Sequence, residues 1–212
     1  MGLKIDLHVH TRRYSPCSRL DPERLVRQGV KAGLDGIVIT EHHHQWLDEE
    51  LAELVEAADA PGFLLLSGFE YMSRHGDLLV YGLEPNRVAD LLPGMPPRDA
   101  VLMVRLWGGV CIAAHPTRAG MGFDEEILTL PVDAIEVCST NLQPHEQRLA
   151  RKLAQQAGKP AIAASDAHHL PDVGAYAAEF DDPIRSMRDL KRAIRRGRFR
   201  TVPQAPQEAR TT

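Results

Sequence analysis

The sequence predicts one α/β barrel with a mostly parallel sheet, and three observations lead to this fold class. Seven short apolar stretches alternate with segments of helical spacing, as in βα units. The apolar stretches lack polar alternation, which is typical of strands buried on both faces. The length of 212 residues allows one large core. Seven strands in one domain favour a closed or nearly closed barrel, while an open doubly wound sheet stays an alternative.

Each predicted strand is a short run rich in Val, Ile, Leu or Ala. In chain order, the runs cover residues 3–10, 36–41, 63–70, 77–83, 110–115, 134–138 and 160–165. Helical segments lie between them. The first, 21–33, begins with the N-cap residue Asp21 and with Pro22 in its first turn, and Gly33 ends it.

The second predicted helix, 47–58, repeats apolar residues on one face. These residues are Leu47, Leu51, Leu54, Val55 and Ala58. Segments 144–157 and 186–196 follow a similar pattern. We therefore predict one domain over residues 1–200. The segment 201–212 has two prolines, two glutamines and few apolar side chains, so we expect a poorly ordered tail there.

The overall composition is that of an ordinary globular protein with a small negative charge. Hydrophobic residues make up 43%, charged residues 25%, and the formal net charge is −4. This charge disfavours nucleic acid as a partner without excluding it, and it gives no attraction to anionic membranes. No apolar run reaches the ~18 residues of a membrane span, and the first residues lack a signal-peptide layout. Cys17, Cys111 and Cys138 have no metal-like spacing and are expected to be reduced thiols in a cytoplasmic protein.

Eight of the ten histidines lie at the C-terminal ends of predicted strands. They occur in the segments Asp6-Leu7-His8-Val9-His10, Glu41-His42-His43-His44, His115-Pro116 and Asp166-Ala167-His168-His169. Glu70 ends the third predicted strand, and Asp77 begins the fourth, beside the loop that joins the two. In a barrel the C-terminal strand ends carry the active site, so these side chains are expected to converge. One such histidine alone is more often structural, but the whole set predicts a metal site.

The spacing and the types of side chain indicate which metals could bind. Residues two apart in a strand point to the same face, so His8 and His10 can bind one ion together. Imidazole with carboxylate suits Zn²⁺, Mn²⁺ or Fe and disfavours Ca²⁺. Of the neighbouring His42, His43 and His44, at most one or two can face inward; His42 is assigned to the site, and which of the three faces it stays open.

These segments resemble the PHP (polymerase and histidinol phosphatase) domain family of metal-dependent phosphoesterases. The resemblance runs from Asp6-Leu7-His8-Val9-His10-Thr11 to Asp166-Ala167-His168, which is nearly the whole chain. Between them, Thr40-Glu41-His42 and His115-Pro116 match two further signature segments, and Glu70 matches the glutamate of the third strand. The resemblance implies a distorted seven-stranded β/α barrel that binds two or three divalent metal ions.

Three positions depart from the family pattern. The family often has Ser-Asp-Gly after its first histidines, with the aspartate as a ligand, but this chain has Tyr14-Ser15-Pro16-Cys17. Glu41 replaces an aspartate, and Asp77 replaces a histidine. The missing carboxylate leaves Ser15, a weak neutral donor, at the first-loop position. We therefore expect unequal affinities, with the third ion weakest, and a Ser15→Asp variant should tighten that ion if the loop aligns in this way.

The predicted function is metal-assisted hydrolysis of a small phosphorylated substrate, with a water activated by the ions as nucleophile. One ion is assigned to His8, His10, Glu70 and Asp166, a second to Glu70, Asp77 and His115, and a third to His42 and His168. His42 and His168 could instead orient the nucleophile. They are predicted catalytic residues together with Arg118, which is preferred over Arg12, Arg13 and Arg19 for binding phosphate. Glu136 and Asn141 are candidates for supporting the ligands.

Two other functions stay open. An amidohydrolase-type C–N hydrolase also begins with His-x-His at a strand end, but it would need a lysine at a strand end, and Lys159 precedes its strand. A non-catalytic, metal-stabilised module that binds a partner protein or a nucleic acid is compatible with the altered ligand set. The retention of almost every other ligand-type residue favours an enzyme. The sequence predicts no membrane association and leaves the oligomeric state open.

Overall fold

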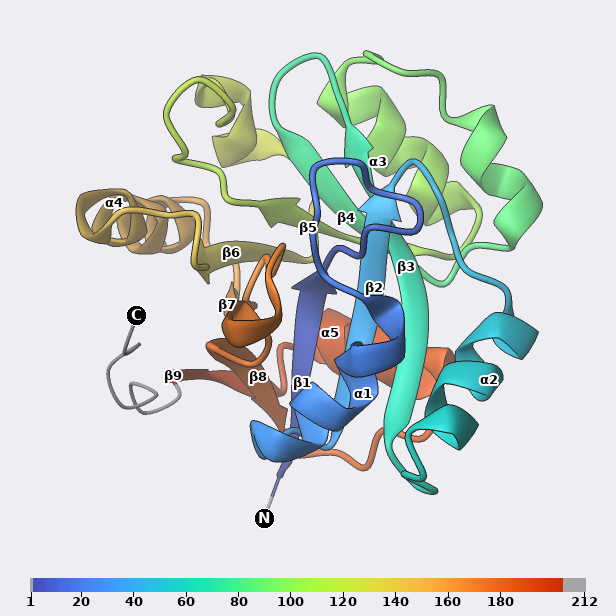
Figure 1. Cartoon of the computed structure of the whole chain (residues 1–212). Helices are drawn as coiled ribbons and strands as arrows, with labels where there is room; N and C mark the ends of the chain where they lie inside the picture. Colours follow the sequence, from blue (N-terminus) through green and yellow to red (C-terminus); the bar gives the residue numbers. More distant parts are fainter. Residues whose placement is uncertain (1, 204–212) are drawn as a thin grey trace.

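The strands form a single sheet that curls into a nearly closed barrel (Figure 1). The structure is a computed structural model that describes residues 2–203. Within this range the strands are β1 (Leu3–Val9), β2 (Gly36–His42), β3 (Leu64–Met72), β4 (Asp77–Tyr81), β5 (Val110–Ala114), β6 (Ala134–Cys138), β7 (Ala161–Ala163), β8 (Tyr176–Phe180) and β9 (Phe199–Pro203). Their order across the sheet is β7-β6-β5-β4-β3-β2-β1-β8-β9.

Most of the strands run in one direction. Only β4 and β8 run against the others, because their pairings with both neighbours are antiparallel. The barrel closes where β1 meets the segment after β7. There Val9 forms a parallel bridge with Ala167, and the backbone N–H of His10 donates to Ala167 O at 3.0 Å. The predicted mostly parallel barrel is therefore confirmed.

The strand count differs from the prediction. All seven predicted strands are present, but β8 and β9 were not predicted; they add an antiparallel pair beside the first residues of β1. The predicted tail 201–212 was wrong at its start, since residues 201–203 belong to β9. These residues are held in a strand because Thr201 pairs with Ala178 and Val202 with Ala177, and their composition does not indicate this pairing. Residues 204–212 lie outside the described range.

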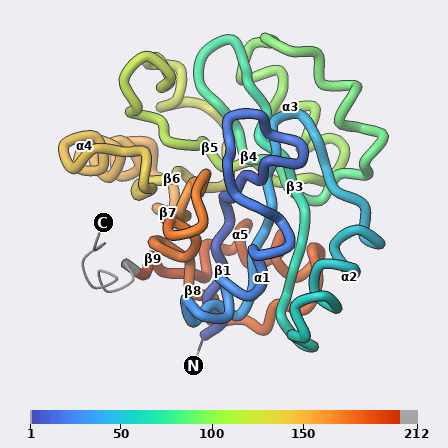
Figure 2. Tube along the Cα trace, viewed as in Figure 1, coloured from blue at the N-terminus to red at the C-terminus, as the bar shows by residue number. Residues whose placement is uncertain are grey.

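Helices cover the outer face of the barrel, as the chain trace shows (Figure 2). They are α1 (Pro22–Lys31), α2 (Asp48–Ala57), α3 (Pro97–Leu106) and α4 (Pro144–Gln156), while α5 (Met187–Arg196) lies at one end of the barrel; short 3₁₀ turns occur at Pro85–Asp90, Glu125–Thr129 and Leu170–Asp172. Helix α3 was not predicted, although its buried Ala100, Val101 and Val104 have helical spacing. No helix in the described part of the chain is long and apolar enough to cross a membrane.

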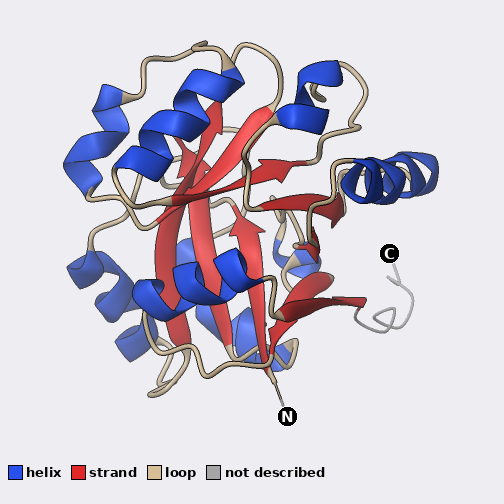
Figure 3. Ribbon diagram, turned by 180° about the vertical axis from the view of Figure 1, so that it is seen from behind, coloured by secondary structure: helices blue, strands red, loops and turns tan. Residues whose placement is uncertain are grey.

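The interior of the barrel is apolar at the N-terminal end of its parallel strands. Inward-facing residues such as Leu7, Tyr81 and Ile112 are fully buried in one cluster with Leu190 and Ile194 of α5. Helix α5 therefore closes the N-terminal end of the barrel, and the view from behind shows a helix lying across the strands (Figure 3). At the opposite end, where the parallel strands finish, the interior is lined by polar side chains.

The reversed strand β4 brings one of these polar residues to the same end. A short turn at 73–76 follows β3, and Gly76 adopts a left-handed φ of 86° there. As a result Asp77, the first residue of β4, lies opposite Met72 of β3 and Ala114 of β5. The start of an antiparallel strand therefore joins the C-terminal ends of its parallel neighbours.

Candidate metal centre

The eight predicted ligand residues lie together at the C-terminal rim of the barrel. Apart from Asp77 at the start of β4, they come from the C-terminal ends of β1, β2, β3 and β5 or the residue after, and from the segment that follows β7. Four overlapping groups of three offer ligand atoms that all lie within 4.8 Å of one another. The groups are His8–His10–Glu70, His8–His115–Asp166, Glu70–Asp77–His115 and His10–His42–His168. The predicted residues thus converge, while metal binding itself stays a prediction.

Glu70 lies at the centre of the cluster and is only 2% exposed. Its Oε1 is 3.0 Å from His115 Nε2 and 3.5 Å from His8 Nε2. Its Oε2 is 3.3 Å from His10 Nε2 and 3.1 Å from His42 Nδ1. One carboxylate therefore faces four imidazoles, which is the arrangement expected of a carboxylate that bridges two ions.

Asp166 approaches the first two histidines from the other side. Its Oδ1 lies 3.4 Å from His8 Nε2 and 3.6 Å from His10 Nε2, and these two ring nitrogens are 3.0 Å apart. Both Asp166 and His115 have left-handed backbone angles, with φ of 53° and 26°. Such angles in residues other than glycine are strained and cluster at functional sites.

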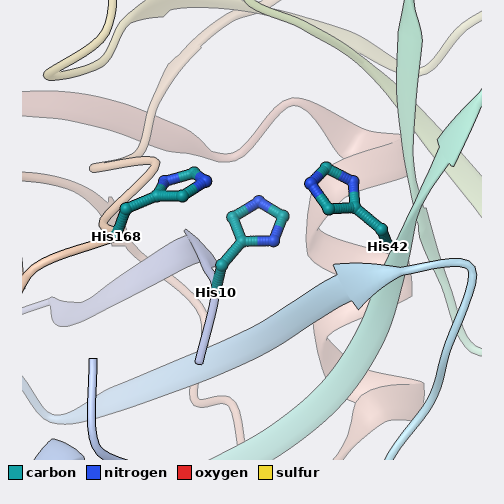
Figure 4. Close-up of side chains that lie close together, drawn as sticks. All are labelled: His10, His42 and His168. Atoms are coloured by element: carbon teal, nitrogen blue, oxygen red, sulfur yellow. The ribbon is translucent and has the colours of Figure 1, made fainter. Parts of the chain in front are cut away.

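The remaining group contains only histidines (Figure 4). The ring centroid of His10 is 4.6 Å from that of His42 and 4.6 Å from that of His168. In the close-up, His42 and His168 each direct a ring nitrogen toward the space beside His10. Their side chains are 27% and 21% exposed, so this group lies at the open side of the cluster.

Two further side chains hold the ligands in place. Glu136 is fully buried; its Oε1 is 3.0 Å from His8 Nδ1, and its Oε2 accepts a hydrogen bond from the backbone N–H of His115 at 2.7 Å. Asn141 donates to Asp166 Oδ2 at 2.8 Å. Both residues were candidates for this role, because a ligand histidine usually donates its second ring N–H to a carboxylate or carbonyl.

The electrostatics of the cluster fit divalent cations. Six buried carboxyl groups lie in this half of the barrel, and no Lys or Arg among the described residues is buried. They are Asp6, Glu41, Glu70, Asp77, Glu136 and Asp166. Burial alone would raise the pKa of Glu70, but His8, His10 and His115 hold it well below its usual range. Buried anions need cationic partners, and the imidazole-carboxylate set is one that Zn²⁺, Mn²⁺ or Fe accepts.

Unpaired ring nitrogens support the same fit. His115 Nδ1 is buried without a hydrogen-bond partner, and His42 Nδ1 faces Glu70 Oε2 without hydrogen-bond geometry. Burial alone would lower the pKa of His115, yet its hydrogen bond to Glu70 and the nearby carboxylates raise it to about 9. A metal ion would replace the protons that hold this cluster together.

Two motif residues have supporting roles that sequence reasoning did not assign. Asp6 Oδ1 accepts the backbone N–H of Ser165 at 2.9 Å, and its Oδ2 accepts that of Gly174 at 3.0 Å, which ties β1 to the last loop. Glu41 accepts hydrogen bonds from Thr11 and from Trp46 Nε1, which fixes the first loop. The sequence feature that could have indicated these roles is the position of Asp6 and Glu41 beside the histidines of their two motifs.

The first-loop serine also supports the histidines. Ser15 is fully buried, its Oγ lies 3.3 Å from His10 Nδ1, and it accepts the backbone N–H of His42 at 3.2 Å. Because Nδ1 of His10 points away from the other ligands, the serine stands behind them. The expectation that an aspartate at this position would bind the third ion has no support in this geometry.

The arginines differ in their environments. Arg118 NH1 lies 3.9 Å from Asp166 Oδ2, so this guanidinium reaches the cluster. Arg12 and Arg13 instead pair with Asp21 and Glu50 at 2.7 and 3.1 Å. For Arg19, the backbone N–H donates to His168 O at 2.9 Å.

The neighbours of His42 turn away from the cluster. His43 Nε2 accepts a hydrogen bond from the backbone N–H of Met72 at 3.3 Å. The ring of His44 lies against Tyr14, with centroids 3.8 Å apart. Of the three consecutive histidines, His42 is therefore the one that faces the other ligands, which the sequence left open.

Comparisons with known proteins agree with this fold. A family model described as PHP-associated matches residues 144–199. An uncharacterised protein of Methanocaldococcus jannaschii is 27% identical over 146 residues, which cover 64% of this chain and 81% of that protein. A similar structure is that of a two-domain protein of Bacteroides vulgatus, which contains a predicted PHP-like metal-dependent phosphoesterase. The TM-score is 0.73 at 19% identity, and the match covers 96% of this chain and 65% of that protein's chain. An amidohydrolase from Chromobacterium violaceum has a TM-score of 0.63 and 20% identity, covering 97% and 99%. At these identities the two structures show a shared fold.

Proposed function

We propose that the chain is a member of the PHP domain family and a metal-dependent phosphoesterase that hydrolyses a small phosphate ester. The observation that carries this proposal is the set of four imidazoles around the buried carboxylate of Glu70, at the one open end of the barrel. A carboxylate with a purely structural role would not need four histidine partners, whereas a carboxylate that binds metal ions in a hydrolase would be surrounded by such ligands.

The groups of side chains suggest how the ions would be divided. His8, His10 and Glu70, with Asp166 facing both histidines, would hold one ion, and Glu70, Asp77 and His115 would hold a second. His42 and His168 would hold a third beside His10, whose Nε2 faces the first ion position while its Nδ1 faces Ser15. When bound, divalent ions polarise a phosphoryl oxygen and lower the pKa of water so that it becomes a nucleophile near neutral pH. The sharing of Glu70 between two groups makes it the residue best suited to bridge.

Arg118 is the residue we assign to the phosphate group. Its side chain is 31% exposed, so it can reach both solvent and the cluster. The loop that carries it is anchored, because Thr117 Oγ1 donates to Glu146 O and Ala119 N donates to Glu146 Oε1. A fixed guanidinium binds phosphate oxygens in pairs and offsets their charge as the leaving group departs.

A C–N hydrolase is the second candidate, since the fold is shared with an amidohydrolase. Among the described residues no lysine is buried, so the rim lacks the bridging lysine that such enzymes would use. The presence of Arg118 also favours an anionic substrate. A non-catalytic metal module is the third candidate.

Turnover by the metal-loaded full chain separates the three candidates. We expect hydrolysis of p-nitrophenyl phosphate or bis-p-nitrophenyl phosphate with Mn²⁺, Zn²⁺ or Fe²⁺, and none of an N-acyl amino acid. Arg118→Ala should lower kcat/KM for phosphate by roughly 10–100-fold, with Arg118→Lys in between. Arg12→Ala is the matched control, because Arg12 is a rim arginine already paired with Asp21. Cleavage of the amide alone, or no turnover despite bound metal, would reject the proposal.

A further inference from the structure

The group His10–His42–His168 differs from the others because it contains no carboxylate. Three neutral imidazoles leave both charges of a divalent ion uncompensated. The other groups each contain Glu70 or Asp166. An ion held by this group would therefore need an anionic ligand from another residue, and Ser15, which stands behind His10 and His42, does not provide one.

Cys17 lies at this group. Its Sγ is 3.3 Å from His42 Nε2, the nitrogen that is not turned toward Glu70. Ligand bonds of about 2.0–2.1 Å to nitrogen and about 2.3 Å to sulfur place N and S roughly 3.6 Å apart in a tetrahedral zinc site. The observed separation is close to that value. The thiol of Cys17 is also the only exposed one of the three cysteines, all of which lie in the described part of the chain.

The loop that carries Cys17 is held by the same histidines. Ser18 Oγ lies 2.8 Å from His10 O and 3.1 Å from His168 O, within hydrogen-bond distance of both, and Arg19 N donates to His168 O at 2.9 Å. On the other side of Cys17, Ser15 contacts His10 and His42. The residues that flank the thiol therefore bind all three members of the group, which fixes the loop against them.

We propose that Cys17 is the third protein ligand of the ion held by His42 and His168, giving a two-nitrogen, one-sulfur site beside His10. This inference rests on the metal sites of the proposed function and places a thiol in the first loop, where the family often has a ligand aspartate. On binding, the thiol releases its proton to solvent and the thiolate bonds to the ion. A sulfur ligand favours Zn²⁺ or Co²⁺ over Mn²⁺, so this position should differ in metal preference from the carboxylate-rich positions.

Cobalt titration tests the proposal without relying on activity. The full chain, stripped of metal and kept under a reducing, oxygen-free atmosphere, is titrated with Co²⁺ while absorption and stoichiometry are recorded. We expect a thiolate-to-Co²⁺ charge-transfer band in the near ultraviolet that grows with one equivalent only. Cys17→Ser should abolish the band and weaken that equivalent by more than about 100-fold, beyond the loss typical of a supporting residue.

Two control variants sharpen the result. Cys111→Ala removes a buried thiol of β5 and should keep the band, whereas Cys17→Asp should lose the band but keep the equivalent, because it restores an anionic ligand. A band that persists in Cys17→Ser, or no band in a wild-type chain that binds Co²⁺ at all three positions, would overturn the inference while the proposed function stands. Failure to bind any Co²⁺ would overturn both.

Discussion

Replacing Glu136 with glutamine is expected to weaken two of the candidate ion positions and to leave the third unchanged. Both oxygens of this fully buried carboxylate accept hydrogen bonds, one facing His8 Nδ1 at 3.0 Å and the other accepting from His115 N at 2.7 Å. Glutamine has one acceptor oxygen, so one of the two donors would face an NH₂ group. His8 and His115 belong to the groups built around Glu70 and Asp166, whereas the Cys17 side of the cluster has no contact with Glu136.

The size of the effect follows from these two contacts. A buried donor left without an acceptor costs about 1–3 kcal/mol, so the metal-free variant should unfold at lower urea concentration. Loss of a carboxylate behind a ligand histidine typically weakens metal binding by about 10–100-fold. That range corresponds to about 1.4–2.7 kcal/mol per ion.

Competition with a chromophoric chelator measures each affinity in the full chain. Glu179→Gln is the control, since Glu179 is a buried carboxylate of β8 that pairs with Arg200 at 2.7 Å, away from the rim. We expect it to leave all metal affinities unchanged. An equal loss at every ion position in Glu136→Gln, or no loss at any, would refute the view that Glu136 acts through His8 and His115.

Three further predictions follow from the same site. Metal affinity should rise with pH. The pKa of His115 is raised to about 9 and that of Asp77 to about 6, so an ion must displace protons from both side chains. A metal affinity that stays constant between pH 6 and 9 would contradict this. In Cys17→Ser, the ion at His42 and His168 should be lost first to a chelator, because no anionic ligand is left there; metal analysis after partial stripping checks this. Gly68→Ala should lower stability by roughly 1–3 kcal/mol in urea unfolding, because a Cβ there would lie 2.5 Å from Val80 O and 2.6 Å from the ring of Tyr81; an unchanged midpoint would argue against this packing.

The sequence predicts the strands that carry the site better than the rest of the fold. Seven apolar runs match β1 to β7 because parallel strands buried on both faces leave a continuous hydrophobic signal. Strand β9 carries Arg200 and Thr201 on a partly exposed edge, so its sequence resembles a loop. Its order comes from pairing with β8, which no local pattern reveals.

The convergence of these side chains was predicted from their positions along the chain, because strand ends converge in any barrel; their roles stay predictions. What could not be predicted was the conformation of the first loop. Ser15 and Cys17 are two residues apart, and only the fold shows that the serine turns behind the histidines while the thiol meets His42. The spacing of the cysteines did not indicate a metal ligand, because Cys17 meets a histidine 25 residues away rather than a second cysteine.

The contacts of β1 with the segment that follows β7 bear on how the protein is made. Its Asp6 accepts the backbone N–H of Ser165, 159 positions further along the chain, and Val9 pairs with Ala167. During synthesis, His8 and His10 leave the ribosome long before Asp166 and His168 exist to complete their cluster. Contacts of such long sequence separation form late and slowly. Metal capture by the complete site should therefore follow translation of the barrel, and a nascent chain that ends before β7 should bind ions only loosely.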